Sequence, residues 1–238
     1  MALTSEPRNH LLSCLPAGDH QKLFPLLKRV ELKLGTVVYE AGAVLRHVFF
    51  PIDCVISLLC VMKDGESAEI AVVGNEGMVG ISLFMGGEST TSRAVVQNAG
   101  TAYQLDAGVL KREFARGGPL QRLLLRYTQA LMTQMTQTAA CNLHHPVERQ
   151  LCRWLLMSLD RLPDNRIMMT QGLIAKMLGV RRAGATDAAG KLQAEGLIFY
   201  QKGTITVLDR PKMERYTCEC YALVKKEFDR LLPDITAS

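Results

Sequence analysis

The chain has 238 residues, of which 48% are hydrophobic, and a formal net charge of +5 at pH 7. This length and composition suit one or two globular domains with a sizeable core. No apolar run is long enough to cross a bilayer and the first residues lack the apolar core of a signal peptide, so the sequence argues against a membrane or secreted protein and favours a cytoplasmic one. The seven cysteines are scattered, which favours reduced thiols over a disulfide framework.

The stretch from Arg29 to Leu105 is a series of short apolar runs separated by glycine-containing turns. The dipeptide Asp64-Gly65 is typical of a hairpin. Many short strands at close spacing predict a β-sandwich or jelly-roll barrel. Because His47 is the single histidine of this stretch, a cupin-like metal-binding protein, which needs several histidines around one metal, is a remote alternative.

Residues 120–142 contain neither glycine nor proline and predict one long helix, followed by a hinge at His144-His145-Pro146 and an amphipathic helix over Val147–Leu162. Apolar and small polar residues recur in this long helix in alternating steps of three and four, which is typical of a coiled-coil seam. We predict a dimer helix; the alternative is a single amphipathic helix packed on its own barrel. The predicted dimer residues are Leu124, Tyr127, Leu131, Gln134 and Thr138.

The segment Thr170–Ile198 predicts two short helices joined by a tight turn. Thr170 is a suitable N-cap for the first helix, and Gly179 a suitable end. The second helix is predicted from Arg182 to Glu195, with an alanine-rich inner face and Gly196 after its end. This pattern is typical of a helix-turn-helix, whose second helix can enter a DNA major groove.

Two short β-runs around the turn Gln201-Lys202-Gly203 follow at once, and a helix-turn-helix followed by a hairpin predicts a winged helix. Between Arg166 and Lys202 the chain has six lysines and arginines but two acidic residues, as nucleic-acid binding requires. Arg182 is the predicted base reader, Arg181 and Lys202 the predicted phosphate contacts. The full set of predicted DNA-binding residues is Thr170, Gln171, Arg181, Arg182, Thr186, Asp187, Lys191 and Lys202.

The order of these parts resembles the cyclic-AMP receptor and fumarate–nitrate-reductase regulators, the Crp/Fnr family. The resemblance covers nearly the whole chain and is carried by Leu173-Ile174-Ala175, Leu178-Gly179-Val180, Arg182, Gly196-Leu197-Ile198, Gly42, Gly65, Gly77-Met78-Val79-Gly80 and Ser92-Arg93-Ala94. It implies a homodimeric bacterial transcription factor, not an enzyme, whose β-roll senses a signal and whose long helix relays it.

The candidate effector pocket that this resemblance implies consists of Gly80, Ile81, Ser92, Arg93 and Ala94. Cyclic-nucleotide binders of the family place a glutamate directly after the cassette glycine, to hold the ribose hydroxyl. Here Ile81 follows Gly80 and cannot accept that hydrogen bond. Ala94 follows Arg93, where the family usually has a serine whose hydroxyl assists in binding the phosphate. We therefore predict a regulator that cyclic AMP does not control, with a cyclic-nucleotide-responsive regulator of the same family as the alternative.

Neither a cofactor nor a metal is predicted. Iron–sulfur members carry closely spaced N-terminal cysteines, whereas this N-terminal region holds only Cys14. The one tight pair, Cys218-Glu219-Cys220, is expected on a helix that opens at Pro211, where residues two apart point in different directions and do not chelate one metal.

The sequence thus predicts an α+β protein with a β-roll sensor domain (1–118), a dimerisation helix and hinge (119–145) and a winged helix-turn-helix domain (146–238). The expected partners are a palindromic double-stranded DNA operator, a second copy of the chain and an unidentified small-molecule effector, with RNA polymerase as a further candidate and no membrane. A rival interpretation is an interaction module whose basic hairpin binds a protein. A steep loss of DNA binding with rising salt would separate the two.

Overall fold

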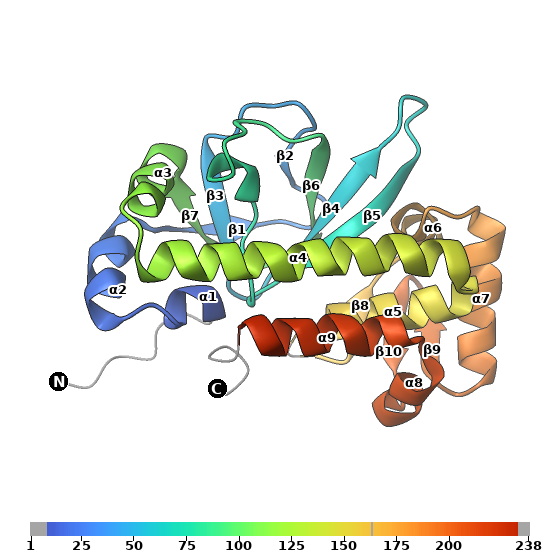
Figure 1. Cartoon of the computed structure of the whole chain (residues 1–238). Helices are drawn as coiled ribbons and strands as arrows, with labels where there is room; N and C mark the ends of the chain where they lie inside the picture. The colour runs from blue at the N-terminus through green and yellow to red at the C-terminus, as the bar shows by residue number, and fades with distance from the viewer. Residues whose placement is uncertain (1–8, 163, 233–238) are drawn as a thin grey trace.

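The computed structural model describes residues 9–162 and 164–232. One long helix, α4 (Pro119–His144), runs through the molecule between an N-terminal β-domain and a mostly helical C-terminal domain (Figure 1). Among the helices of this described part, none combines the length and apolar character that a bilayer crossing requires.

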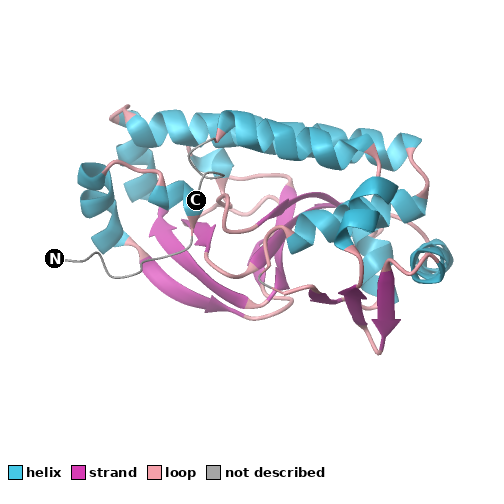
Figure 2. Cartoon of the chain, turned by 90° about the horizontal axis from the view of Figure 1, so that it is seen from below, coloured by secondary structure: helices cyan, strands magenta, loops and turns pink. Residues whose placement is uncertain are grey.

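The β-domain is a roll of two antiparallel sheets, whose strands are among those drawn in magenta in Figure 2. The strand orders are β1-β7-β3 and β2-β6-β4-β5. Its strands are β1 (Lys28–Leu32), β2 (Val37–Tyr39), β3 (His47–Pro51), β4 (Val55–Val61), β5 (Ser67–Val73), β6 (Ser92–Asn98) and β7 (Gly100–Asp106). The short helices around them are α1 (His10–Ser13), α2 (Ala17–Leu23), η1 (Phe24–Leu26), η2 (Ile81–Leu83) and α3 (Ala107–Ala115). The predicted β-roll is therefore confirmed.

The predicted dimer residues of α4 are wrong, because they form the buried face of this helix. Leu124, Tyr127, Leu131, Gln134 and Thr138 are all buried by the chain itself. The Tyr127 hydroxyl donates to the carbonyl oxygen of Met78 (2.9 Å), and the Gln134 amide pairs with both backbone groups of Val72 in β5 (2.6 and 3.2 Å). Tyr127 and Gln134 thus hold α4 on its own β-roll, whereas Thr138 accepts from Arg153 in the helix that follows α4 (3.2 Å). Because all five side chains are buried within one chain, they cannot also face a second copy.

The C-terminal domain begins with α5 (Val147–Leu159) and contains the predicted winged helix-turn-helix. Its remaining elements are β8 (Arg166–Met168), α6 (Gln171–Leu178), α7 (Arg182–Ala194), β9 (Ile198–Gln201), β10 (Thr204–Val207), α8 (Arg210–Tyr216) and α9 (Glu219–Leu231). The three strands form one antiparallel sheet in the order β8-β10-β9. β8 was not predicted, because a strand of three residues carries too little periodicity to be recognised.

The C-terminal domain is attached to the rest of the chain by more than the hinge. Helix α9 returns and lies alongside α4 (Figure 1). There the Phe228 ring packs edge-on against the Tyr127 ring, with centroids 6.5 Å apart. Helix α6 packs against β5, and at the end of α5 Arg161 forms an ion pair with Glu76 (2.7 Å). These contacts fix the orientation of the helix-turn-helix relative to the β-roll.

A buried polar network crosses the same junction. The Glu69 carboxylate of β5 accepts from the Trp154 indole of α5 (2.8 Å) and lies 2.5 Å from the Ser57 hydroxyl oxygen. That hydroxyl oxygen is also 2.8 Å from Oε1 of Gln97, whose amide nitrogen donates to Ser158 of α5 (3.0 Å). Burial raises the pKa of Glu69 from 4.5 to about 7, against the opposing effect of these hydrogen bonds and of nearby arginines.

Candidate nucleic-acid interface

The helix-turn-helix has the local structure that its sequence predicts. The Thr170 hydroxyl caps α6 by accepting from the backbone N–H of Leu173 (3.3 Å). Gly179 ends α6 with φ +65°, and a Cβ at this position would come within 3.1 Å of the Ala68 Cβ on β5. Gly179 thus serves both the turn and the close contact with the β-roll.

Helix α7 presents one packed face and one open face. Its inner face consists of Ala185, Ala188, Ala189 and Leu192, all buried. On the outer face Arg182, Thr186 and Asp187 are exposed, and the Thr186 hydroxyl donates back to the Arg182 carbonyl (3.0 Å). The small alanines let α7 lie close to α5 and α6, so that its arginine-bearing face projects from the domain.

The N-terminus of α7 is suited to bind an anion. Arg181 occupies the N-cap position, where no side chain accepts from the free backbone N–H groups. Such N–H groups, together with the helix dipole, favour a phosphate. Within residues 9–162 and 164–232, no ion pair holds Arg181, Arg182 or Lys202, and all three side chains are exposed.

Lys202 and Gly203 form the tip of the β9–β10 wing, both with positive φ (+48° and +78°). The backbone N–H of Met169 donates to the carbonyl of Gly203 (2.7 Å), which brings the wing tip beside Thr170 and the start of α6. The structure therefore gathers Thr170, the half-buried Gln171 and Lys202 at one edge of the domain.

Lys191 differs from the other predicted DNA contacts. Its ammonium group forms an ion pair with Glu148 of α5 (3.3 Å), because the C-terminal half of α7 packs across the start of α5. Lys191 therefore already has an acidic partner, unlike Arg181, Arg182 and Lys202 in the part of the chain that the structure describes.

The five candidate effector residues lie at two places in the β-roll. Gly80 and Ile81 begin η2, where Gly80 has φ +109° and Ile81 packs partly into the core. Ala94 is fully buried in β6, next to Arg93, whose guanidinium is held by Glu40 (2.8 Å). The residue at the phosphate-binding position thus already has an anionic partner.

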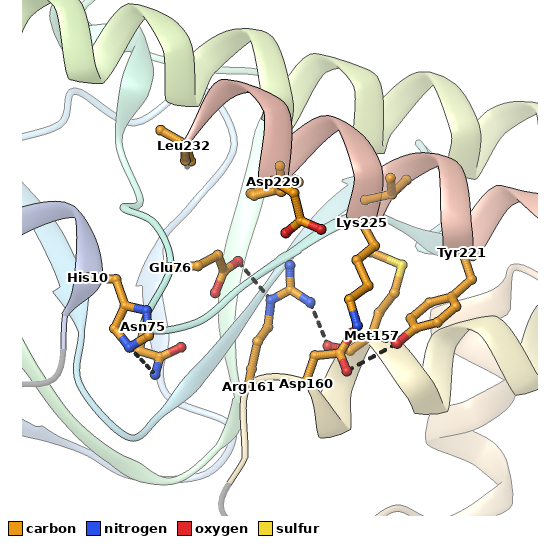
Figure 3. Close-up of a pocket in the computed structure, with 12 residues that line it drawn as sticks. His10, Asn75, Glu76, Met157, Asp160, Arg161, Tyr221, Lys225, Asp229 and Leu232 are labelled. Carbon is orange, nitrogen blue, oxygen red and sulfur yellow. Dashed lines mark hydrogen bonds and ion pairs between the residues drawn. The ribbon is translucent and has the colours of Figure 1, made fainter. Parts of the chain in front are cut away.

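A different pocket of about 470 Å³ lies where α5 and α9 meet the loop after β5 (Figure 3). Figure 3 shows the Arg161–Glu76 ion pair at its wall and, from α9, the Tyr221 hydroxyl meeting Asp160 (3.0 Å). None of the five candidate effector residues lines this pocket.

The expectation that Cys218 and Cys220 point apart is wrong. Helix α8 ends at Tyr216, so that Cys218 is the extended N-cap of a separate helix, α9, and Cys220 is in its first turn. Both sulfurs therefore meet Cys141 and His145 at the end of α4. The thiol of Cys141 donates to Cys218 and lowers the pKa of Cys218, whereas burial raises the pKa of Cys220.

Two sequence families account for most of the chain. The model of the "cyclic nucleotide-binding domain" matches residues 29–116, and that of the "Crp-like helix-turn-helix domain" matches residues 149–216. No curated protein matches the sequence.

Solved structures share the fold at low sequence identity. A Crp/Fnr-family transcriptional regulator from Eubacterium rectale is 16% identical, with a TM-score of 0.69 over 86% of this chain and 96% of that one. FixK2 from Bradyrhizobium japonicum is 14% identical (TM-score 0.66; 81% and 98% covered), and the c-di-GMP-responsive regulator CLP from Xanthomonas campestris is 16% identical (TM-score 0.63; 82% and 100% covered).

The matched regions are the β-roll and the winged helix-turn-helix described above, joined by α4 in the same order. The chain therefore belongs to the Crp/Fnr family of transcriptional regulators and carries the family's DNA-binding helix-turn-helix.

Proposed function

We propose that the protein regulates transcription as a homodimer that reads a palindromic operator without cyclic AMP. The observation that carries this proposal is the open face of α7, with a free helix N-terminus and the exposed, unpaired side chains of Arg181 and Arg182 in the described part of the chain. The proposed limits are residues 1–118 for the β-roll sensor domain, 119–145 for the dimerisation helix and hinge, and 146–238 for the winged helix-turn-helix domain. RNA polymerase stays a predicted partner without an assigned surface.

The surface proposed for dimerisation is the solvent-facing side of α4. Its exposed residues also recur in alternating steps of three and four, and we call them the outer stripe: Arg122, Leu125, Gln129, Met132, Thr136, Ala139 and Leu143. Leu125, Met132 and Leu143 are 51%, 56% and 77% exposed, which is unusual for large apolar side chains placed in register on one helix.

A second copy of the chain is the occupant that this stripe fits best. A heptad spacing keeps one face of a helix against an identical helix over its whole length, which is about 39 Å for 26 residues. A two-fold axis beside α4 also supplies the paired recognition helices that a palindrome requires.

Arg182 is proposed to read a base and Lys202 to contact a phosphate. Operator sequences would first be selected from random duplexes with purified protein at fixed salt. We expect Arg182→Ala to weaken operator binding by roughly 10- to 100-fold and to relax specificity at one position of each half-site. Lys202→Ala should weaken operator and random DNA alike and reduce the salt dependence of binding.

A control for these two variants is Arg29→Ala, which removes the same charge from an exposed position on β1 and should leave DNA binding nearly unchanged. If Arg182→Ala retains full discrimination between operator and random DNA, the role given to Arg182 is wrong. An absence of salt dependence in the wild-type protein would favour the protein-binding interpretation of the hairpin.

Cyclic AMP is proposed not to control DNA binding, because Ile81 offers no acceptor for a ribose hydroxyl and Glu40 already holds Arg93. Allosteric effectors typically change an affinity by about 5- to 150-fold, and we expect no such change in operator affinity when cyclic AMP is added. Selection of an operator only with cyclic AMP present would restore the cyclic-nucleotide alternative. Since CLP is described as responsive to c-di-GMP, this nucleotide is the second ligand to test.

A further inference from the structure

Four metal-binding side chains meet at the junction of α4 and α9. Cys141 is in the last turn of α4, and His145 follows as its C-cap. Cys218 and Cys220 come from the first residues of α9, far along the chain. One ligand atom from each residue can be chosen so that all four lie within 4.8 Å of one another.

The distances agree with a tetrahedral site for one ion. The sulfurs of Cys141 and Cys218 are 3.6 Å apart, and the Cys220 sulfur is 3.7 Å from Nδ1 of His145. Zinc bonds of about 2.3 Å to sulfur and 2.0–2.1 Å to nitrogen place tetrahedral ligands about 3.8 Å apart for two sulfurs, and about 3.6 Å for sulfur and nitrogen. Two of the six ligand distances thus match the tetrahedral values, and the other four are at most 4.8 Å, so that shifts of about 1 Å or less would complete the site.

A second layer of contacts supports the histidine. Its Nε2 lies 3.4 Å from a carboxylate oxygen of Glu219, and its Nδ1 is 3.7 Å from the Cys220 sulfur, so the ring places one nitrogen beside the carboxylate and the other beside the thiols. Zinc-binding histidines generally use their other ring nitrogen in this way, because a carboxylate partner fixes the tautomer and the ring orientation.

The chemistry of the set favours zinc over other metals. We propose that Cys141, His145, Cys218 and Cys220 bind one structural Zn²⁺. Three thiolates and one imidazole form a closed four-coordinate set, as in Cys₃His structural zinc sites. The three cysteines are buried, so no position is open to substrate, and the short ligand distances suit one ion better than a cluster of several irons.

The bound ion would join the two ends of the C-terminal domain. His145 precedes the Pro146 hinge, and Cys218 opens the helix that returns along α4. One ion bonded to both segments would fix the start of the domain and the start of its last described helix to the same point at the end of α4.

Metal analysis of the purified full chain tests the site. We expect about one zinc per chain in the wild type and in Cys152→Ala, a matched control that removes a buried neighbouring cysteine outside the set. The double variant Cys218→Ser, Cys220→Ser should retain less than a tenth of this zinc. Removal of zinc by a chelator should lower the wild-type Tm by roughly 5–10 °C.

A second measurement uses only the wild-type chain, in case the double variant does not fold. Co²⁺ added to reduced, zinc-free protein should give the intense visible spectrum of a tetrahedral site and ultraviolet thiolate charge-transfer bands, saturating at one equivalent. Protein without zinc that also gives no such spectrum would overturn the proposal. So would iron with inorganic sulfide at this site, or a disulfide between Cys141 and Cys218 in the native protein.

Discussion

A protein carrying both Leu125→Glu and Met132→Glu is expected to be monomeric and to bind its operator roughly 100- to 10,000-fold more weakly than the wild type. Both side chains belong to the outer stripe and are more than half exposed, so their replacement should not disturb the fold. Across a two-fold axis each glutamate would face an apolar surface or a second glutamate, and either arrangement opposes association. A monomer binds only one half-site of the operator, so it loses the increase in affinity that a dimer obtains by binding two linked half-sites.

Light scattering after gel filtration gives the mass, and titration of labelled operator at fixed salt gives the affinity. Met85→Glu is the matched control, because Met85 is 57% exposed but belongs to the β-roll and not to α4. This control should remain a dimer with wild-type affinity. If the double variant is still dimeric, the outer stripe is not the dimer interface.

Glu69→Gln is expected to make the protein more stable than the wild type above pH 7, although it removes a buried hydrogen-bonded carboxylate. A glutamine can still accept from Trp154, and its NH₂ can donate to Ser57. The Ser57 hydroxyl is then free to donate to Gln97. The amide thus reproduces the hydrogen bonds of a protonated Glu69 without a charge to bury.

The direction of the pH effect follows from the raised pKa of Glu69, about 7 in the folded protein against 4.5 ordinarily. Between these values the folded protein keeps the proton and the unfolded chain releases it. The contribution of Glu69 to stability is therefore complete below pH 4.5, declines as pH rises, and is lost above pH 7. The difference is on the order of 3 kcal/mol, or a Tm change of roughly 6–12 °C for a chain of this size.

Unfolding curves recorded from pH 5 to pH 8.5 measure this effect. Wild type and Glu69→Gln should be of similar stability at pH 5 and diverge towards pH 8. Glu66→Gln, which changes an exposed glutamate on the β4–β5 turn, should retain the wild-type dependence on pH. Parallel curves for wild type and Glu69→Gln would mean that Glu69 is ionised in the folded protein.

The winged helix-turn-helix could be predicted from sequence because its signals are local. Thr170 and Gly179 mark the ends of α6, and the glycine turn Lys202-Gly203 marks the wing, all within a few residues of the groups they affect. The exposure of Arg182 followed from its position opposite the alanines of α7. The ion pair of Lys191 could not be predicted in this way, because its partner Glu148 comes from another helix, α5.

The two faces of α4 show that a heptad-like spacing does not specify which face of a helix is buried. Steps of three and four are present in both the buried stripe around Tyr127 and the exposed stripe around Met132. Spacing alone does not say which stripe meets the β-roll. Hydrogen bonds decide this: the Gln134 side chain matches the backbone of Val72 in β5, a partner 62 residues away.

The four-ligand group was missed for a related reason. Cys218 and Cys220 are two residues apart, and the prediction placed both on one continuous helix. In the structure α8 ends before Thr217, and a separate helix, α9, begins after Cys218. Cys141 and His145 lie one turn apart on α4, and nothing in the sequence links them to a segment more than seventy residues later. Only tertiary packing brings the two pairs together.

The return of α9 to α4 has a consequence for synthesis on the ribosome. Phe228 covers Tyr127, and the side chain of Arg126 donates to the carbonyl of Leu231, so α9 completes the packing around α4. This part of the nascent chain stays uncovered until translation has passed the end of α9, whereas the outer stripe emerges much earlier. The pairing through the outer stripe proposed above can therefore begin before either chain has finished folding, and a chain truncated before α9 would leave the Tyr127 side of α4 uncovered.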